Sequence, residues 1–451
     1  MVPYDRDGEP MTVPGHRPYG EQLADTLAFA VEHIPWYRDR VHEYRRPMRD
    51  SEDLARLPIV GRADVLADQR AFASTDEWPA SISYSSSTTG TVGQPRWRSE
   101  AEQRALIDLL VASRPDAVPG EEDDGVTLVI HPFDQGPPSA PAWVTRRVYV
   151  AMLVPWHFEL IHQILRDGWE SPAGRLPVTA VDCFSPGLRI LTQWFEQRQI
   201  EPASFGVTHL FGYGSIQPAS WRRRLEASWG ADYRDLYGLS EVVLSDSAQC
   251  PLCHAYHFVL PIVPEVVDPI TREPIDRGTG VLLLTELYPY AQMQLLVRYW
   301  TDDLVELAPP CPLGGFGFTF RGRRGSSVVV ERADGPALVI GSLQVGEVCA
   351  ASADLAIDGV SWAPWAVDAG APRFSLTSLT TAATEGTDVH VTVELRYPPE
   401  QFPERATAAI DEIAAGLRSV VTGLDAAVDR GTVRLRVTAV GPGELPDTVK
   451  V

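Results

Sequence analysis

Between residues 125 and 211, short apolar runs alternate with helix-like segments. The runs at Gly125–His131, Pro177–Asp182 and Val207–Phe211 have the length and content of buried strands, whereas Gly187–Gln197 has the apolar period of a helix. Strands that alternate with helices predict an α/β sheet, and ligands bind such sheets at the carboxyl ends of the strands. We therefore expect a sheet with a binding site along one edge.

The pattern changes at Pro261, where short strands joined by turns replace the alternation. Val263–Val267, Gly280–Leu284, Leu295–Trp300 and Phe316–Phe320 are predicted to be antiparallel strands, because turn residues such as Asp, Gly and Pro separate them. This part of the chain is expected to differ in architecture from the part before it.

Gly322-Arg-Arg-Gly325 is a predicted hinge, and the segments after it predict a small α+β domain. That domain is expected to contain the strands Ser326–Val330, His390–Arg396 and Thr432–Ala439 and the helix Glu404–Val421. Gly370–Thr387 is its most linker-like stretch.

The charge balance argues against some classes of partner. The 451 residues carry 60 acidic against 39 basic side chains, a net charge of −21, which repels nucleic acid and anionic membrane surfaces. No apolar run approaches the length of about 18 residues that a transmembrane helix needs, and the first residues lack the features of a signal peptide. With five cysteines, the chain is expected in the reducing cytoplasm, where clustered cysteines bind metal.

The stretch Asp235-Leu-Tyr-Gly-Leu-Ser-Glu241 combines the groups that a nucleotide–Mg²⁺ site needs. Tyr237 offers a flat ring on which a base can stack, and Gly238 offers a permissive backbone. Ser240 and Glu241 add a hydroxyl and a carboxylate, and carboxylate oxygens are ligands that Mg²⁺ prefers. A turn with an exposed glutamate is the alternative interpretation of this stretch.

A second stretch, Ser83-Tyr-Ser-Ser-Ser-Thr-Thr-Gly-Thr-Val-Gly-Gln-Pro95, is dense in hydroxyls and glycines. Glycines let backbone N–H groups approach phosphate oxygens, and hydroxyls supply further donors. No lysine follows in the Gly-Lys-Ser/Thr pattern of a Walker loop. The stretch therefore predicts a phosphate loop of another kind, with a simple Ser/Thr linker as the alternative.

With both stretches in view, the chain resembles the adenylate-forming superfamily and, within it, the phenylacetate–CoA ligase family. Five segments between residues 20 and 325 carry the resemblance, in the family's order. They are Ala30-Val-Glu-His-Ile-Pro-Trp-Tyr-Arg38, Leu57-Pro-Ile-Val-Gly-Arg-Ala-Asp-Val65, the Ser/Thr stretch, Asp235–Val242 and Arg298-Tyr-Trp-Thr-Asp-Asp-Leu304. Asp235–Val242 is close to the family's D-I-Y-G-L-S-E-V, and the last segment is similar to its R-Y-R-T-x-D-L.

The resemblance implies a large N-terminal adenylation domain over residues 1–322, with a distorted β-barrel subdomain near 258–322, and a small mobile lid domain over 323–451. It also implies that a carboxylate attacks the α-phosphate of ATP, giving an acyl-adenylate and pyrophosphate. Glu241 would hold Mg²⁺, and Asp303 would accept hydrogen bonds from the ribose hydroxyls. The other expected nucleotide contacts are Ser85, Ser86, Ser87, Thr88, Thr89, Gly90, Gly212, Tyr213, Gly214, Tyr237, Gly238, Ser240 and Arg323.

The chain departs from the family at some of these positions. Ser87 stands where the family has glycine, and Gly325 and Ser326 stand where it has two acidic residues after the hinge. The family's C-terminal lysine corresponds best to Lys450, in a segment with Asp447 where the family has arginine. Lys450 is expected to be the catalytic lysine of adenylation, with an unspecialised terminal lysine as the alternative.

A cysteine and histidine cluster lies between residues 250 and 257. Cys250 and Cys253 form a C-x₂-C knuckle, His257 follows, and Cys311 lies in a second Cys-Pro turn. A Cys₃His set predicts a closed tetrahedral Zn²⁺ site with a structural role, and some members of the resembled family carry zinc here. His254 is the rival of His257 as a ligand, and buried thiols with surface histidines are the alternative to a metal site.

The family's acyl pocket corresponds to His131, Trp156, His157 and Phe211. Their rings suit a flat aryl or arylacetic acid, although a plain core role is the alternative for each. The leading prediction is a ligase that activates such an acid with ATP and Mg²⁺ and transfers it to coenzyme A. Transfer to an amine or a carrier protein, as in some relatives of specialised metabolism, stays open. So do a non-catalytic nucleotide-binding or ligand-binding descendant and the oligomeric state, for which a homodimer is one candidate.

Overall fold

The computed structural model describes residues 19–44, 54–74, 78–84, 93–112, 125–131, 147–152, 154–172, 174–312, 314–332, 335–360, 362–380 and 386–446. Its helices are α1 (Tyr19–His33), α2 (Pro35–Arg38), α3 (Val41–Tyr44), α5 (Arg62–Ala67), α6 (Glu100–Ala112), α7 (Pro155–Asp167), α8 (Ser185–Gln197), α9 (Ala219–Trp229), α10 (Ser342–Ala351), α11 (Pro403–Val420) and α12 (Leu424–Asp429), with 3₁₀ turns η1 (Gln69–Phe72), η2 (Pro202–Phe205) and η3 (Arg324–Ser326). None of these helices combines the length and apolar content needed to cross a membrane.

The strands are β1 (Val60–Gly61), β2 (Ser81–Tyr84), β3 (Pro95–Arg98), β4 (Val126–His131), β5 (Arg147–Ala151), β6 (Trp169–Ser171), β7 (Gly174–Leu176), β8 (Val178–Phe184), β9 (His209–Tyr213), β10 (Asp232–Leu239), β11 (Val242–Gln249), β12 (Tyr256–Phe258), β13 (Ile262–Val267), β14 (Thr279–Glu286), β15 (Tyr299–Leu307), β16 (Gly317–Arg323), β17 (Val328–Val330), β18 (Leu338–Ile340), β19 (Phe374–Thr380), β20 (Thr387–Glu394) and β21 (Val433–Val440).

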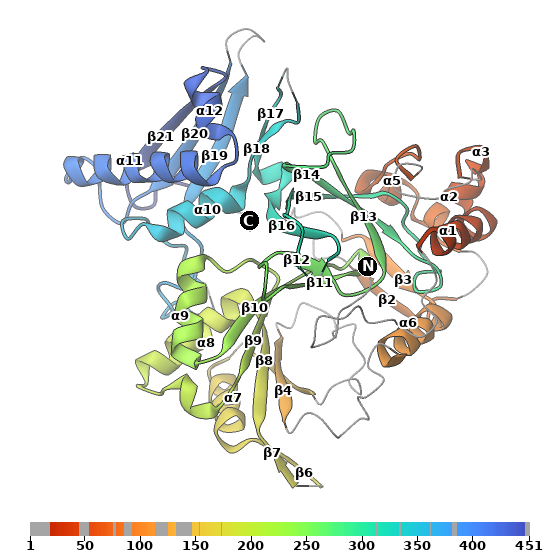
Figure 1. Ribbon diagram of the computed structural model, residues 1–451. Helices are drawn as coiled ribbons and strands as arrows, with labels where there is room; N and C mark the ends of the chain where they lie inside the picture. The colour runs from red at the N-terminus through yellow and green to blue at the C-terminus, as the bar shows by residue number, and fades with distance from the viewer. Residues whose placement is uncertain are drawn as a thin grey trace.

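Most strands belong to one mixed sheet of 12 strands, in the order β13-β14-β15-β16-β12-β11-β10-β9-β8-β4-β5, with β1 beside β15 (Figure 1). From β5 to β10 the strands are parallel, and from β10 to β13 they are antiparallel. Strand β10 joins the two halves, because its first residues pair with β9 and its last with β11. The predicted α/β sheet is therefore confirmed.

Helices α7, α8 and α9 cover one face of the parallel half (Figure 1). On α8, Leu188, Leu191 and Phe195 recur at helical spacing and form an apolar stripe. This stripe packs in one core with alternate residues of the strands, including Val181 and Leu210. The opposite face of the parallel strands carries polar and aromatic side chains such as Asp182 and Phe211 beside the buried Val129.

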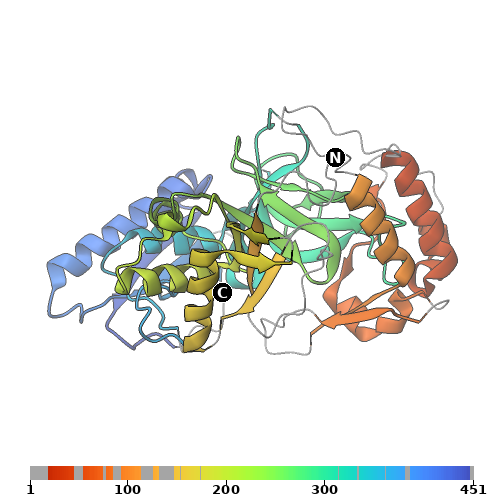
Figure 2. The same cartoon turned by 90° about the horizontal axis from the view of Figure 1, so that it is seen from below.

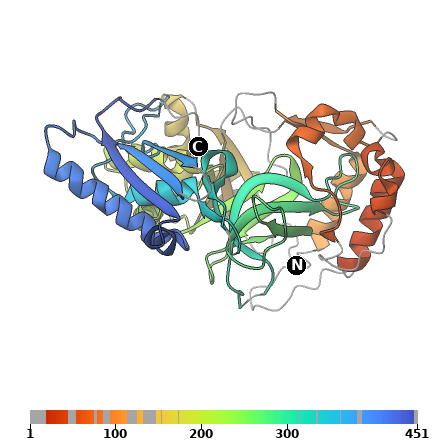
Figure 3. The same ribbon diagram turned by 90° about the horizontal axis from the view of Figure 1, so that it is seen from above.

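The antiparallel half lies between helices α1–α3 at one end of the molecule and the C-terminal layer at the other (Figure 2, Figure 3). A distorted β-barrel was expected near residues 258–322, but the described strands do not close. Strand β13 is an edge with β14 as its neighbour, and β11 and β10 carry the same sheet on into the parallel half. The expected barrel is thus an open sheet, because β10 continues the ladder instead of closing it.

One strand of this half begins later than predicted. The strand expected at Leu295–Trp300 starts at Tyr299 as β15. Arg298 has a left-handed backbone with φ of 50°, which an extended strand does not allow. Its buried side chain pairs with Glu265 at 3.1 Å and donates to the Ala55 carbonyl at 2.8 Å. The tertiary contacts of Arg298 therefore displace the start of the strand.

The C-terminal residues form a small layer in which the sheet β19-β20-β21 is covered by α11 and α12 (Figure 1). On α11, Ile413 and Leu417 lie one turn apart and share a core with Val389 and Val391 of β20. The linker predicted over residues 370–387 is wrong, because it contains β19. Its Ser- and Thr-rich sequence is extended because β19 pairs with β20 along its whole length.

Residues 362–370, which we call the docking segment, pack on the helices of the parallel half. Ala363, Ala366 and Ala369 are buried in the same core as α7, α8 and α9. Three backbone carbonyls of the segment accept hydrogen bonds of 3.1 Å: Trp365 from Gln197 Nε2, Asp368 from Trp221 Nε1 and Gly370 from Arg189 Nη1. The C-terminal layer is thereby held against the parallel half.

Candidate functional site

Four side chains that were expected at a nucleotide site meet in the structure, and we call them the acidic cluster: Tyr237, Glu241, Asp303 and Arg323. They come from β10, the turn after it, β15 and β16. The Tyr237 hydroxyl donates to Oδ2 of Asp303 at 2.8 Å, and Nε of Arg323 lies 3.2 Å from Oδ1 of the same carboxylate. Asp303 and Arg323 are register partners on neighbouring strands, which explains why they meet.

The charge of the acidic cluster is unbalanced toward the negative. Asp303 is 1% exposed, and burial raises its pKa to about 6, although Arg323 and the Tyr237 hydroxyl lower it. The carboxylates of Glu241 and Asp302 lie near enough to raise the pKa of Asp303 as well. Glu241, Asp302 and Asp303 are thus close enough to interact electrostatically with the single guanidinium of Arg323, and a surplus of carboxylates attracts a cation.

Glu241 lies in the turn between β10 and β11 and is 6% exposed. Its Oε2 accepts a hydrogen bond of 3.3 Å from Oγ of Ser240. The hydroxyl and the carboxylate that are adjacent in the sequence therefore point the same way. The interpretation of Glu241 as an exposed turn residue is wrong. Gly238, on β10 and three residues before Glu241, lies close to Asp246, whose Oδ1 would be 2.8 Å from a Cβ at that position.

Gly212, Tyr213 and Gly214 lie at the carboxyl end of β9, beside β10. A Cβ on Gly212 would be 2.0 Å from the Tyr233 hydroxyl, so packing within the sheet already requires glycine there. Gly214 has φ of 80°, a left-handed conformation that ends the strand. The Tyr213 carbonyl accepts a hydrogen bond of 3.2 Å from Oγ of Ser185. These residues form a tight strand end next to the strand of Tyr237.

Two of the expected acyl-pocket residues lie close to this strand end. His131 ends β4, and its ring centroid is 6.0 Å from that of Tyr213. Phe211 is two residues before Tyr213 on β9, so it projects from the same face of the sheet. Leu210, which precedes Phe211 and projects from the other face, belongs to the core under the helices. The rings of His131, Phe211 and Tyr213 therefore gather on the face that α7–α9 leave uncovered.

Trp156 and His157 begin helix α7, which follows β5. Trp156 is 62% exposed, and its ring centroid is 4.0 Å from that of His157, which is 8% exposed. Nδ1 of His157 accepts a hydrogen bond of 3.4 Å from the backbone N–H of Val154, at the start of the helix. The last residue of β5, Ala151, is the register partner of His131. Trp156 and His157 follow β5 in the chain, so they lie beyond the edge of the sheet at which His131 ends β4. His157 thus also stabilises the start of helix α7.

Asp182 was not anticipated, although it lies among these residues. It is the register partner of Phe211, in the middle of the parallel half. Burial raises the pKa of its carboxyl, while Arg147 and His131 lower it, and its Oδ1 has no hydrogen-bond partner in the described part of the chain. The sequence signal that could have found it is a single acidic residue within the apolar run Val178–Phe184.

The cysteine and histidine side chains converge at the end of β11, at β12 and in the connection before β16. The potential ligand atoms of Cys250, Cys253, His257 and Cys311 all lie within 4.8 Å of one another. The sulfurs of Cys250 and Cys311 are 3.9 Å apart, and Sγ of Cys253 is 3.2 Å from Nε2 of His257. In a tetrahedral site with metal–sulfur bonds of about 2.3 Å, two sulfurs are roughly 3.8 Å apart, so the spacing fits one metal ion.

The turn between β11 and β12 donates backbone hydrogen bonds to the cysteine sulfurs of this group. The backbone N–H of Leu252 donates to the sulfur of Cys250 at 3.4 Å. Burial raises the pKa of the Cys250 thiol, but the backbone N–H groups of Cys253 and Leu252 outweigh that effect and lower it. His254, the rival ligand, does not belong to the group of residues described above. Of the two histidines, His257 is the one with a potential ligand atom among the cysteine sulfurs.

Ser85, Ser86, Ser87, Thr88, Thr89, Gly90 and Lys450 lie outside the described residues. The strands that flank the Ser/Thr stretch are described: β2 and β3 pair as a hairpin, with Tyr84 opposite Pro95. Arg96, 1% exposed, donates to both carboxylate oxygens of Glu286 on β14, at 2.8 and 2.9 Å. This buried pair ties the hairpin to the main sheet, so both ends of the Ser/Thr stretch are fixed beside β14.

No family model matches the chain. The chain is 23% identical over 304 residues to the phenylacetate-coenzyme A ligase of Thermus thermophilus, which covers 64% of each protein. It is 24% identical over 315 residues to the phenylacetate-coenzyme A ligase of Pseudomonas putida, which covers 64% of this chain and 66% of that one. The chain thus matches less than two thirds of the length of these relatives.

A solved structure of 2-hydroxyisobutyryl-CoA ligase, an open conformation in complex with 2-HIB-AMP and CoA, has a TM-score of 0.66. It is 17% identical in sequence, and the match covers 95% of this chain and 88% of that one. At this identity the likeness establishes the fold. The chain therefore has the fold of the adenylate-forming CoA ligases and, by its sequence, is similar to phenylacetate–CoA ligase among them.

Proposed function

We propose that the protein activates a carboxylic acid with ATP as the acyl-adenylate and transfers the acyl group to coenzyme A. The observation that carries the proposal is the acidic cluster, in which side chains from three strands and a turn meet around Asp303. The similarity to phenylacetate–CoA ligases, and to a ligase solved with 2-HIB-AMP and CoA, supports it.

In the first step, a carboxylate oxygen of the acid attacks the α-phosphorus of ATP, and the bond from that phosphorus to the departing pyrophosphate breaks. Both reactants are anions, so the site has to orient and neutralise them. Asp303 is held by Tyr237 and Arg323 and accepts hydrogen bonds from the ribose hydroxyls. The strand end at residues 212–214 takes the adenine, next to Tyr237.

Magnesium bound with ATP supplies positive charge at the phosphates. Glu241 is the residue that would hold it, since a carboxylate is a preferred Mg²⁺ ligand and the carboxylates of Asp302 and Asp303 add to the attraction. In this proposal the hydroxyls and N–H groups of residues 85–90 contact the phosphates, and Lys450 is the lysine of the first step. Replacing Lys450 by alanine should then slow adenylation and leave acyl transfer unchanged.

In the second step, the thiolate sulfur of coenzyme A attacks the acyl carbon, and AMP leaves with the electrons of the acyl–phosphate bond. We propose that residues 323–451 act as the lid in this step and residues 1–322 as the body. A core whose buried members all lie between Val328 and Val433 supports this division, although the docking segment packs in the core of the parallel half.

The acid is proposed to be an aryl or arylacetic acid. The rings of His131, Phe211 and Tyr213 gather on the face of the parallel strands opposite α7–α9, where a flat apolar group can pack against them. The buried carboxyl of Asp182 lies on the same strand pair and adds one polar acceptor. Trp156 and His157 lie beyond the same edge and complete the proposed pocket.

We also propose that Cys250, Cys253, His257 and Cys311 bind a structural Zn²⁺ ion. Four protein ligands leave no open position for substrate. The ion would join the turn after β11 to the connection between β15 and β16, and β15 carries Asp303. Its role would be to stabilise the frame of the acidic cluster.

The test is ATP–pyrophosphate exchange without coenzyme A, against a panel of aryl, arylacetic and short acyl acids. We expect exchange with at least one aryl acid, and then thioester formation when coenzyme A is added. An amine acceptor serves as the comparison for the second step. Protein that binds ATP but exchanges pyrophosphate with no acid in the panel would contradict the proposal.

A further inference from the structure

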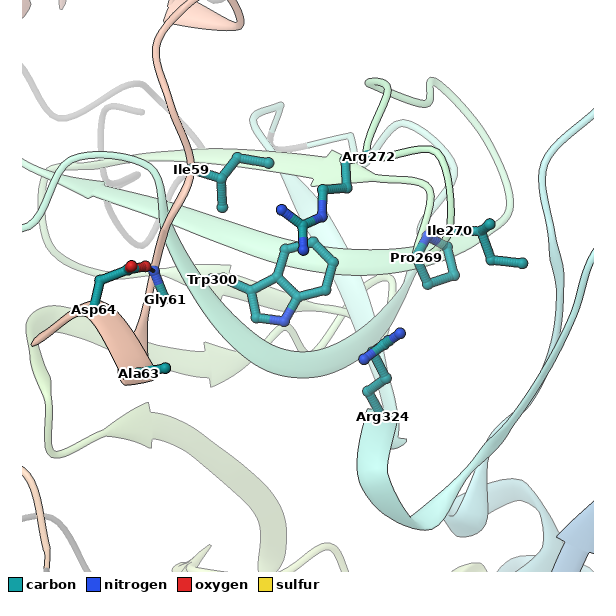
Figure 4. Close-up of a pocket in the computed structure, with 9 residues that line it drawn as sticks. All are labelled: Ile59, Gly61, Ala63, Asp64, Pro269, Ile270, Arg272, Trp300 and Arg324. Atoms are coloured by element: carbon teal, nitrogen blue, oxygen red, sulfur yellow. Dashed lines mark hydrogen bonds between the residues drawn. The ribbon is translucent and has the colours of Figure 1, made fainter. Parts of the chain in front are cut away.

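A cavity of about 390 Å³ lies on the side of β15 away from the acidic cluster. It is lined by the segment around Ile59 and Asp64, the connection between β13 and β14, Trp300 of β15, and Arg324 of η3 (Figure 4). Trp300 packs with the small core around Leu283 and Leu304, whereas Tyr237 belongs to a different core. The cavity is therefore separate from the proposed nucleotide site.

Two guanidinium groups approach the indole ring in this cavity. The Cζ atom of Arg272 lies 5.4 Å from the Trp300 ring centroid, and that of Arg324 lies 5.8 Å from it. Figure 4 shows Arg272 above the ring and Arg324 near the edge that carries its nitrogen. Within the described ranges, neither arginine forms an ion pair with a carboxylate. In a chain of net charge −21, two unneutralised cations at one cavity are available to an anionic ligand.

The loop that presents Arg272 is fixed by its own hydrogen bonds. Oδ1 of the buried Asp268 accepts from the backbone N–H groups of Ile270 and Thr271, at 2.8 and 2.9 Å. Oδ2 of the same residue accepts from Ala337 N at 2.6 Å, which joins the loop to the connection between β17 and β18. Arg272 thus starts from an anchored backbone, which lowers the entropy lost when its side chain binds a ligand.

The carboxylates near the cavity already have donors. Oδ2 of Asp64 accepts from the Gly61 backbone N–H at 2.8 Å, and Oδ1 of Asp302 accepts from the Trp300 indole N–H at 2.6 Å. In Figure 4, Asp64 lies on the opposite side of the ring from Arg324. Of these two carboxylates, that of Asp64 lines the cavity, across the indole ring from Arg324.

We propose that this cavity binds a small aromatic oxyanion, whose phosphate or carboxylate group lies between Arg272 and Arg324. The planar guanidinium group of arginine can donate two parallel hydrogen bonds to a phosphate or a carboxylate group, and its positive charge complements theirs. The flat body of the ligand packs against Trp300 and the aliphatic side chains of Ile59 and Ile270. Because Arg324 directly follows β16 and Arg272 lies in the connection between β13 and β14, an occupant ties the start of the C-terminal region to the antiparallel half of the main sheet.

Isothermal titration of the full chain with phenyl phosphate tests the proposal. Arg272→Gln and Arg324→Gln should each weaken binding about tenfold, which is the size of a lost charge-assisted hydrogen bond. Arg277→Gln is the matched control, since it removes one exposed charge from the same connection outside the cavity, and it should change affinity by less than about twofold. Ala63→Leu, which fills the cavity without changing charge, should also weaken binding.

Two further probes distinguish the sources of the oxyanion. Titration with benzoate and with inorganic phosphate separates a preference for carboxylate from one for phosphate, and shows what the ring contributes. Binding of phenyl phosphate that is equal in wild type, Arg272→Gln and Arg324→Gln would overturn the proposal, as would the absence of saturation in the millimolar range. An equal loss in Arg277→Gln would also overturn it, because it would show an effect of overall charge. None of these readouts depends on ligase activity.

Discussion

The acidic cluster and the cysteine–histidine group show two ways of arranging polar side chains in one sheet. The acidic cluster takes Tyr237, Asp303 and Arg323 from three strands, and its carboxylates outnumber its guanidinium. The cysteine–histidine group takes Cys250 and Cys253 from one short turn and His257 from β12, which follows it, and its ligand atoms lie within 4.8 Å of one another. The first keeps an unsatisfied charge for a ligand, whereas the second is complete with one ion. The difference predicts that changes in the first affect activity and changes in the second affect stability.

The largest effect is expected from Glu241→Gln. The amide keeps the shape but loses the charge that would hold Mg²⁺, so the rate of ATP–pyrophosphate exchange should fall on the order of 10²-fold or more. Thermal unfolding should be unchanged. Glu273→Gln, at an exposed position between β13 and β14, is the control. Exchange at the wild-type rate in Glu241→Gln would remove this residue from the proposed metal site.

Asp303→Asn should act on nucleotide affinity. The substitution weakens the charged contact with Arg323 and the acceptor for the ribose, so the KM for ATP should rise about tenfold while kcat changes less. Initial rates at varied ATP concentration measure both constants, and Asp276→Asn is an exposed control. A loss confined to kcat would show that Asp303 acts on the reaction step and not on binding of the ribose.

Cys250→Ser should affect stability and leave the chemistry of folded protein intact. Serine is a poor zinc ligand, so zinc content by elemental analysis and the melting temperature should fall together, the latter by several degrees. His254→Gln changes the rival histidine and should alter neither quantity. A native protein that contains no zinc, or a Cys250→Ser variant with unchanged melting temperature, would contradict the assignment.

The smallest effect concerns Asp235, on the same strand as Tyr237 but outside the acidic cluster. It is 4% exposed, and burial raises its pKa to about 7 although the Tyr233 hydroxyl, donating at 2.5 Å, lowers it. An unfolded aspartate has a pKa of about 3.9, so the folded state binds the proton more tightly and stability falls as pH rises from about 4 to 7. Asp235→Asn should reduce this slope in urea unfolding at a series of pH values. Asp303, whose pKa burial raises to about 6, accounts for slope that remains. A slope unchanged by the substitution would contradict the raised pKa of Asp235.

The parallel half of the sheet could be predicted from the sequence, because buried strands such as β4 and amphipathic helices such as α8 show a local periodicity of apolar residues. Tyr237 and Asp303 come together because β10, β11, β12, β16 and β15 are neighbours in the sheet. Local sequence patterns do not predict this order of strands, so the contact could be expected only from the family resemblance. The lack of a hydrogen-bond partner for Oδ1 of Asp182 within the described residues depends on neighbours that are distant in sequence. The open sheet in place of a barrel depends on the dual pairing of β10. These features are tertiary, and no local signal encodes them.

The docking segment is held by alanine methyl groups and by backbone carbonyls. A buried methyl group contributes only about 0.8 kcal/mol, and a carbonyl oxygen is present whatever side chain the residue carries. Mutation can therefore replace Asp368 and leave the hydrogen bond to its carbonyl in place, while a larger residue at position 363, 366 or 369 would force the segment off the helices. In a set of related chains, these three positions should stay small while the residues between them vary.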